Sequence, residues 1–96
     1  TSTWAIRGEF KPFVQSEGSK ALAELYLATS LAHGVMVQGE ITGGCSDSGI
    51  AAACGCDVVC AVGPAGGGFH TPNEYVRLET VVPKATVLFN TMMGLP

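Results

Sequence analysis

The fold that the sequence predicts is decided by the run Asp57-Val58-Val59-Cys60-Ala61-Val62, followed by Gly63-Pro64-Ala65-Gly66-Gly67-Gly68-Phe69-His70. The first part, 57–62, is almost continuously apolar, which is typical of a strand buried on both faces of a sheet. A long loop, 63–73, follows it, with four glycines among its first six residues. Because ligands of α/β folds bind outside the carboxyl ends of the strands, we expect this loop to lie at a binding site.

Two more strands and three helices are expected along the chain. Alternating apolar residues predict a strand over Thr1–Phe13, and a short strand is expected over Val35–Ile41. Apolar residues at helical spacing predict helices over 19–34, 48–54 and 79–93. The resulting order, β-α-β-α-β-loop-α, is typical of a layered α/β domain whose strands are at least partly parallel.

Small polar residues and glycines mark the ends of the expected helices. Ser16 is a candidate N-cap for the first helix, and Gly34 is its candidate C-cap. Ser46 or Asp47 is expected to cap the second helix, which Gly55 ends.

The composition indicates a domain with an unusually apolar surface for its size. The 96 residues are 47% hydrophobic, with a mean hydropathy of +0.34, which fits one part of a larger domain whose core is shared. A net charge of −3 and only five scattered Lys and Arg residues argue against nucleic-acid binding, which requires a basic surface. No apolar run approaches the roughly 20 residues that span a bilayer, so we expect no membrane partner.

The four cysteines are expected to be free thiols. They are Cys45, Cys54, Cys56 and Cys60. Their spacing matches no disulfide framework, and their Ala- and Val-rich surroundings predict burial. Since reduced cysteines are typical of proteins in reducing compartments, we expect a cytoplasmic location.

His70 is the candidate metal ligand. Neutral imidazole is a common ligand of zinc, and the glycines before it allow the backbone to approach a ligand closely. Glu74, four residues on, is a candidate to orient or neighbour the histidine. Two alternatives stay open: a solvated histidine on a surface loop, and a structural zinc site made of His70 with Cys54, Cys56 and Cys60.

The segment Gly43-Gly44-Cys45-Ser46-Asp47 is the second motif. A glycine turn followed by a capped helix presents backbone N–H groups at a helix N-terminus, which attracts carboxylate or phosphate. A plain helix cap is the simpler interpretation. The segment is neither a phosphate-binding P-loop nor a dinucleotide fingerprint, because its glycine spacing differs and no Gly-Lys-Ser/Thr follows.

Together the two motifs resemble the end of the catalytic domain of co-catalytic, two-zinc exopeptidases. The motifs are Gly43-Gly-Cys-Ser-Asp47 and, further along, Gly63-Pro-x-Gly with His70-Thr-x-x-Glu74. This family includes glutamate carboxypeptidases, aminoacylases and succinyl-diaminopimelate desuccinylase. The resemblance covers nearly the whole chain. It implies a three-layer α/β/α zinc-exopeptidase-like catalytic domain, with 1–96 as its C-terminal β-α-β-α-β-α portion.

The resemblance assigns roles residue by residue. His70 matches the last zinc ligand of the family. The residues matched to the substrate pocket are Gly43, Gly44, Ser46, Asp47 and, before Pro12, the basic residue Lys11. Relatives commonly have Thr or Ala where Cys45 stands, so the resemblance implies no hydroxyl contact there. The other zinc ligands, the general-base glutamate and the dimerisation domain would lie outside 1–96.

The implied activity is hydrolysis of a peptide or N-acyl amide bond in a small substrate. Two zinc ions per active site would share a water and lower its pKa. The intact protein would be a homodimer, whereas the isolated chain, with one matched ligand, is expected to be inactive. Two alternatives are a non-catalytic remnant of such an enzyme and a small α/β module that binds an anion at Ser46.

Overall fold

Helix α1, Glu17–Ala32, is the longest element of the computed structural model, which describes residues 1–96. It begins where expected, because the Ser16 hydroxyl accepts a hydrogen bond from the backbone N–H of Ser19 at 3.0 Å. The same hydroxyl donates to the Asp57 carboxylate at 2.7 Å, which brings a negative charge to the helix N-terminus. After the helix, Gly34 adopts a left-handed φ of 70°, so both predicted ends are confirmed.

Helix α2, Asp47–Ala53, is short and also begins at its predicted cap. The Ser46 hydroxyl accepts from the backbone N–H of Ser48 at 3.3 Å. Gly55 follows the helix with a φ of 87°, a backbone conformation that a side chain would disfavour. The predicted start at Ser46 and end at Gly55 are therefore confirmed.

The C-terminal helix consists of a 3₁₀ turn, η1, Leu78–Thr80, and the α-helix α3, Val81–Met93. Pro83 lies within the first turn of α3, where a missing backbone N–H costs no hydrogen bond. Helix α3 packs along α1 through a narrow stripe that includes Val87 and Thr91, both buried. Other apolar residues of the helix, such as Val82 and Phe89, face outward and are exposed.

The loop predicted over 63–73 contributes the first strand of a small antiparallel ribbon that the sequence did not predict. Strand β1, Gly66–Gly67, pairs with β2, Tyr75–Val76, with Gly66 opposite Val76 and Gly67 opposite Tyr75. Arg77 extends the ribbon by donating its backbone N–H to the carbonyl oxygen of Ala65 at 2.8 Å. This ribbon is the only sheet of the chain.

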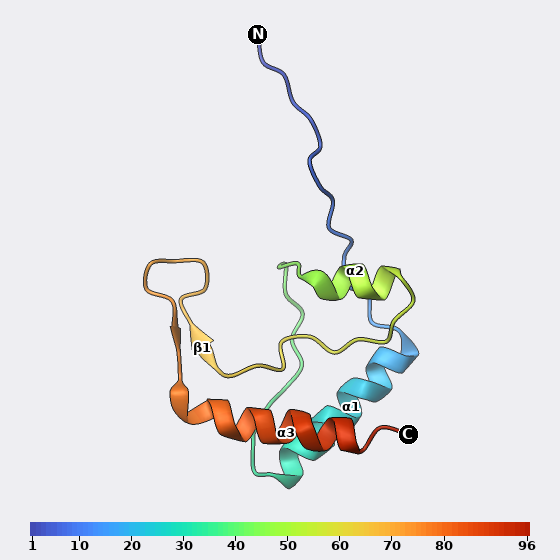
Figure 1. Ribbon diagram of the computed structural model, residues 1–96, viewed down its shortest axis with the longest axis vertical. Helices are drawn as coiled ribbons and strands as arrows, with labels where there is room; N and C mark the ends of the chain where they lie inside the picture. The colour runs from blue at the N-terminus through green and yellow to red at the C-terminus, as the bar shows by residue number, and fades with distance from the viewer.

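The three predicted strands, Thr1–Phe13, Val35–Ile41 and Asp57–Val62, are wrong, because none of them pairs with another strand. None of the three is a strand, and Ala61 within 57–62 has a left-handed φ of 59°, which interrupts an extended conformation. A strand forms only where a neighbour accepts its backbone hydrogen bonds. Residues 1–13 are exposed throughout, and the first part of this segment stands away from the body of the molecule, whereas Lys11 and Phe13 pass beside α2 (Figure 1). Backbone groups of the other two segments, Val35–Ile41 and Asp57–Val62, form hydrogen bonds with residues of helix α1 instead.

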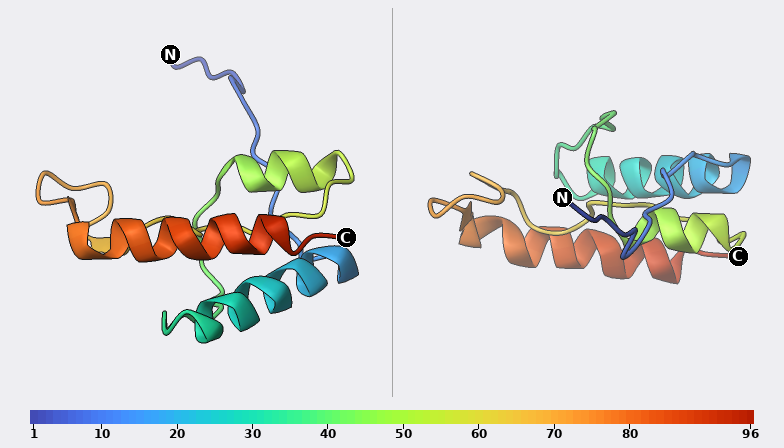
Figure 2. Two further views of the ribbon diagram at one scale, coloured as in Figure 1. Left: turned by 60° about the horizontal axis from the view of Figure 1, so that its bottom comes forward. Right: turned by 90° about the horizontal axis from the view of Figure 1, so that it is seen from above.

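Hydrogen bonds to side chains of α1 hold the apolar segment 57–62 in place, although it has no partner strand. The Val58 backbone N–H donates to the Ser19 hydroxyl at 2.8 Å, and the Tyr26 hydroxyl donates to the Val62 carbonyl at 3.3 Å. The segment thus lies along one face of α1. Figure 1 shows it between α2 on one side and the α1–α3 pair on the other, and Figure 2 shows α1 and α3 side by side.

The core is small. Six of the 96 residues are buried, and the buried hydrophobic side chains are Tyr26 and Val87. The helical spacing of apolar residues in 19–34 predicts a buried stripe of Leu22, Leu25, Tyr26, Thr29 and Ala32. On α1 the buried residues are Ser19, Tyr26 and Ser30, so the stripe is right at Tyr26 but wrong at Ala32, which is exposed. The chain is therefore a mixed α/β structure only in a loose sense, with three helices and one two-stranded ribbon.

Candidate functional site

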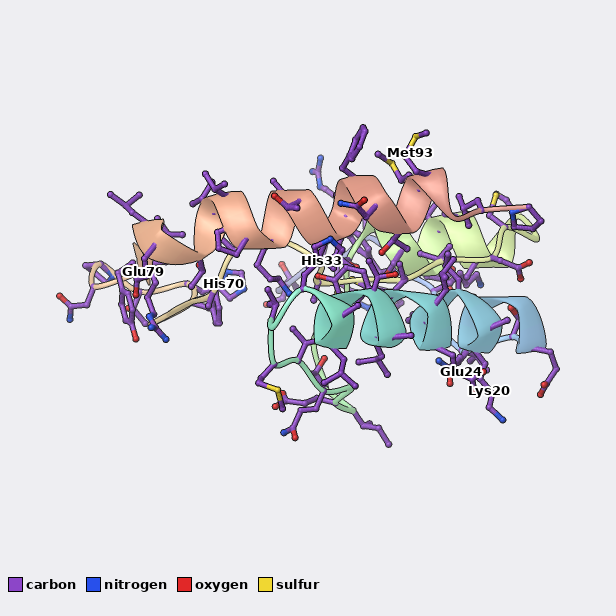
Figure 3. The ribbon with its side chains drawn as sticks, turned by 90° about the horizontal axis from the view of Figure 1, so that it is seen from below. Lys20, Glu24, His33, His70, Glu79 and Met93 are labelled. Atoms are coloured by element: carbon purple, nitrogen blue, oxygen red, sulfur yellow. The ribbon has the colours of Figure 1, made fainter.

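His70 lies in the loop that joins the two strands of the ribbon, and its side chain is exposed. Its φ of 62° is in the left-handed region, which is uncommon for a residue with a side chain. No hydrogen bond or ion pair engages the imidazole, whereas the ring of the chain's other histidine, His33, bonds the Thr29 carbonyl at 2.8 Å. The two histidines belong to separate elements, as Figure 3 shows. His70 is thus free to bind a ligand.

Glu74 neighbours His70 as expected, but it acts on the backbone. Its Oε2 accepts from the backbone N–H of His70 at 3.3 Å. Thr71 supports the same loop, because its hydroxyl donates to the Gly68 carbonyl at 2.6 Å and its own carbonyl accepts from the Glu74 N–H at 3.1 Å. The loop therefore holds the position of His70 through main-chain contacts and leaves the ring unconstrained.

The glycines before His70 are required by the ribbon. A Cβ at Gly66 would overlap the Tyr75 carbonyl oxygen, and one at Gly68 would lie 2.8 Å from the Asn73 carbonyl oxygen. Gly68 also has a left-handed φ of 66°. The sequence predicts that these glycines let the backbone approach a ligand. In the structure they let the two sides of the ribbon approach each other.

The second predicted motif, Gly43–Asp47, is exposed and leads into α2. Gly44 has no left-handed φ and has only one atom near its missing Cβ, the Thr42 hydroxyl oxygen at 3.9 Å. The turn therefore does not require glycine at that position. The Asp47 carboxylate already lies in the first turn of α2, which reduces the attraction of this helix start for another anion.

Ser46, at the end of the turn, contacts Cys60, a neighbour that the sequence does not predict. Its hydroxyl lies 3.3 Å from the Cys60 sulfur and 2.6 Å from the Ser48 hydroxyl. Hydrogen bonds from Ser46 and then Ser48 lower the pKa of the Cys60 thiol below its ordinary value. The cluster combines residues 14 positions apart, so no local sequence signal could have revealed it.

The predicted burial of the cysteines is wrong, although all four are free thiols as expected. Each is exposed, because 57–62 forms no sheet that could cover it. The alternative zinc site of Cys54, Cys56, Cys60 and His70 is not assembled, since no group of three His, Cys, Asp or Glu side chains is placed to hold a metal ion.

Lys11 lies beside the start of α2 through its backbone. A Cβ on Gly49 would overlap the Lys11 carbonyl oxygen, so the two backbones touch. The Lys11 ammonium forms an exposed ion pair with Glu9 at 2.8 Å. The structure thus brings Lys11 close to the helix that begins at Asp47, but it forms no bond between Lys11 and the Gly43–Asp47 turn or His70.

A shallow depression of about 410 Å³ lies against the ribbon, and its lining includes Phe69, the residue before His70, but not His70 itself. Its lining consists of Pro64, Ala65, Gly66, Phe69, Glu74, Tyr75 and Val76. Phe69 and Glu74 come from the loop that carries His70, and Tyr75 and Val76 form β2. The sequence analysis gave Phe69 and Tyr75 no role. Two aromatic residues close to a glycine-rich loop could have indicated an apolar binding surface.

Comparisons with models of known protein families, with characterised proteins and with solved structures returned no match. None of the helices has the length and apolar character needed to cross a membrane.

Proposed function

We propose that this chain supplies one zinc ligand, His70, and part of the substrate pocket to a two-zinc hydrolase of the co-catalytic exopeptidase family. The substrate would be a small peptide or an N-acyl amino acid. The observation that carries the proposal is the state of His70: an exposed imidazole without a hydrogen bond, on a backbone held at a φ of 62°. Strained backbone persists where the surroundings enforce it, and such positions cluster at functional sites.

The arrangement of the helices supports the three-layer α/β/α part of the proposal. Helices lie on two sides of 57–65: in the view from above, α1 lies on one side and α2 and α3 lie on the other, as a helix, sheet, helix order requires (Figure 2). The extended segments expose apolar side chains, among them Met36 and Ile41, and their backbones lack ladder partners. Both features fit residues 1–96 as part of a larger domain in which further strands complete the sheet.

The residues of this chain could supply one ligand, His70, to a zinc site. His70 offers a neutral nitrogen donor, and a catalytic zinc site needs about three protein ligands. The remaining ligands and the general base would come from outside 1–96. When bound, the zinc ions would lower the pKa of a shared water and polarise the scissile carbonyl. The part of this chain is to hold the His70 backbone in place, through the bond that its N–H donates to Glu74.

On the substrate side, the proposal assigns carboxylate recognition to the Gly43–Asp47 turn and Lys11. Lys11 would have to exchange its exposed partner, Glu9, for the substrate, and an exposed ion pair of this kind is weak. Gly44 leaves open space beside the turn. The proposal includes a homodimer, as the family resemblance implies, and a cytoplasmic location, which free cysteines favour.

Replacement of His70 in the complete protein tests the proposal. We expect His70→Ala to remove most of the activity and roughly one zinc per subunit, measured by elemental analysis. His33→Ala is the matched control, because it removes an exposed histidine whose ring already bonds the Thr29 carbonyl. Unchanged zinc content and full activity in His70→Ala would overturn the proposal. A protein that binds no zinc would favour the non-catalytic remnant instead.

A further inference from the structure

The depression beside His70 has the size of a small-molecule site. Its volume of about 410 Å³ falls within the range of typical ligand pockets. Phe69, which directly precedes His70, forms part of its lining, as does Tyr75 of β2. The depression therefore shares the ribbon loop with His70, through Phe69 and Glu74.

The Tyr75 ring is held in place before any ligand arrives. It fills the space that a side chain on Gly67 would occupy, since a Cβ there would lie 2.8 Å from the phenolic oxygen and 3.0 Å from two ring carbons. The residue is still 57% exposed, so part of the ring remains available. A pre-positioned aromatic wall lowers the entropic cost of binding.

The charge of the lining indicates what it would receive. Glu74 is its one acidic residue, and Glu74 Oε2 accepts a hydrogen bond from the His70 backbone N–H at 3.3 Å. No Lys or Arg lines the depression. The nearest basic residue along the chain, Arg77, pairs with Glu79 at 2.8 Å. A substrate carboxylate would find no partner here, whereas an apolar side chain would be covered by Phe69 and Val76.

We propose that this depression is the subsite for an apolar side chain of aromatic size, next to the scissile bond of the substrate. The inference rests on the proposed function and narrows its substrate class to peptides or N-acyl amino acids that carry such a side chain.

The first test measures binding by the full 96-residue chain without added metal. N-acetyl-L-phenylalanine is compared with N-acetylglycine, which has the same charge but no side chain, by NMR shifts of Phe69, Tyr75 and Val76. We expect the phenylalanine probe to bind at least about fivefold more tightly, and Phe69→Ala to remove most of that difference. Gly67→Ala, which displaces the Tyr75 ring, should weaken binding as well. Phe89→Ala is the matched control, because Phe89 is an exposed aromatic residue on α3.

Equal binding of the two probes, or shifts confined to other residues, would overturn the inference. Preference for N-acetyl-L-arginine would overturn it too, because Glu74 and the aromatic rings would then form a site for a cation.

A second test separates this inference from the proposed function. If the complete protein hydrolyses N-acyl amino acids with zinc but Phe69→Ala leaves the ratio of kcat/KM for phenylalanine and glycine substrates unchanged, the subsite is overturned and the hydrolase stands. If the complete protein lacks activity but binds N-acetyl-L-phenylalanine at Phe69, the apolar site is supported and the hydrolase falls.

Discussion

The backbone N–H of His70 donates a 3.3 Å hydrogen bond to Oε2 of Glu74, and this contact spans the turn of the ribbon loop. It fixes the main chain at one of the two non-glycine residues with a left-handed φ, His70 at 62°, the other being Ala61 at 59°. The imidazole of His70 forms no hydrogen bond or ion pair within the chain. Backbone strain and an unengaged ring at one position are what the proposed ligand role requires.

His70→Gly should separate strain from function. Glycine accepts a left-handed φ without the penalty of roughly 1–2 kcal/mol that a Cβ carries, so we expect the chain's unfolding free energy in urea to stay equal or rise. In the complete protein the same variant should lose about one zinc per subunit, as His70→Ala does. A clear fall in the unfolding free energy would instead mean that the imidazole has packing contacts that stabilise the loop.

Gly49→Ala should destabilise the chain, although the same change in an ordinary helix stabilises it by about 1 kcal/mol. Gly49 is buried in α2, and a Cβ there would overlap the Lys11 carbonyl oxygen. Since two backbones cannot both stay in place, we expect a loss of about 1–3 kcal/mol in urea unfolding. Gly39→Ala, with nothing within 4 Å of the new Cβ, is the control and should change little. A stabilised Gly49→Ala would show that α2 does not pack on residues 11–13.

Local signals and long-range contacts explain which parts of the fold were predictable. The caps at Ser16 and Ser46 and the stops at Gly34 and Gly55 depend on residues within one turn of the helix, so the sequence reading found them. The strand over 57–62 depends on partners elsewhere. The apolar pattern of 57–62 is real, but it is satisfied by Ser19 and Tyr26 of α1 instead of by a sheet.

The same distinction applies to the candidate site. His70 was identified from its place after the glycine run, and the structure leaves it exposed and free of hydrogen bonds. Two contacts join residues from different elements: Ser46 lies against Cys60, and the Tyr75 ring lies over Gly67. Neither contact has a local pattern, because each depends on how the chain returns after a turn.

The Cys60 thiol should ionise at lower pH than an ordinary cysteine. Hydrogen bonds from Ser46 and Ser48 favour the thiolate and lower its pKa. In a chain with the other three cysteines replaced by serine, the rate of alkylation by iodoacetamide should reach half its maximum below the ordinary thiol pKa of about 8.5. Ser46→Ala should move this midpoint upward, and Ser2→Ala, on the N-terminal arm, should not. An identical midpoint in Ser46→Ala would exclude the hydroxyl as the cause.

The sign of the accompanying stability change follows from the same shift. Because the pKa of Cys60 is lower in the folded than in the unfolded chain, its contribution to stability is fully present above the unfolded thiol pKa. The contribution is lost as the pH falls through the lowered folded pKa. Stability should therefore rise with pH across this window, and it should rise less in Ser46→Ala.

All four thiols should react with a thiol reagent such as DTNB in the native chain, without denaturant or reductant. The structure places Cys45, Cys54, Cys56 and Cys60 at the surface, so no unfolding step should limit the reaction. The count in denaturant should be the same, at four. A lower native count with four in denaturant would mean that further chain covers the cysteines, as a completed sheet would require.

Two buried serines of α1 provide the sharpest test of the packing. The Ser19 hydroxyl accepts the Val58 backbone N–H at 2.8 Å, whereas the Ser30 hydroxyl oxygen is buried without a partner. Either serine-to-alanine change gains the same helix propensity, so the difference between the two variants isolates the hydrogen bonds.

We expect Ser19→Ala to lower the unfolding free energy by about 1–3 kcal/mol, because it leaves the Val58 N–H unsatisfied. Ser30→Ala should be neutral or stabilising, since it removes a buried hydroxyl that has no hydrogen bond. Amide exchange supplies an independent readout, in which Val58 should lose protection in Ser19→Ala only. The reverse order of stabilities would mean that 57–62 does not lie along this face of α1, and the helix, extended segment, helix arrangement that supports the proposed fold would then fail with it.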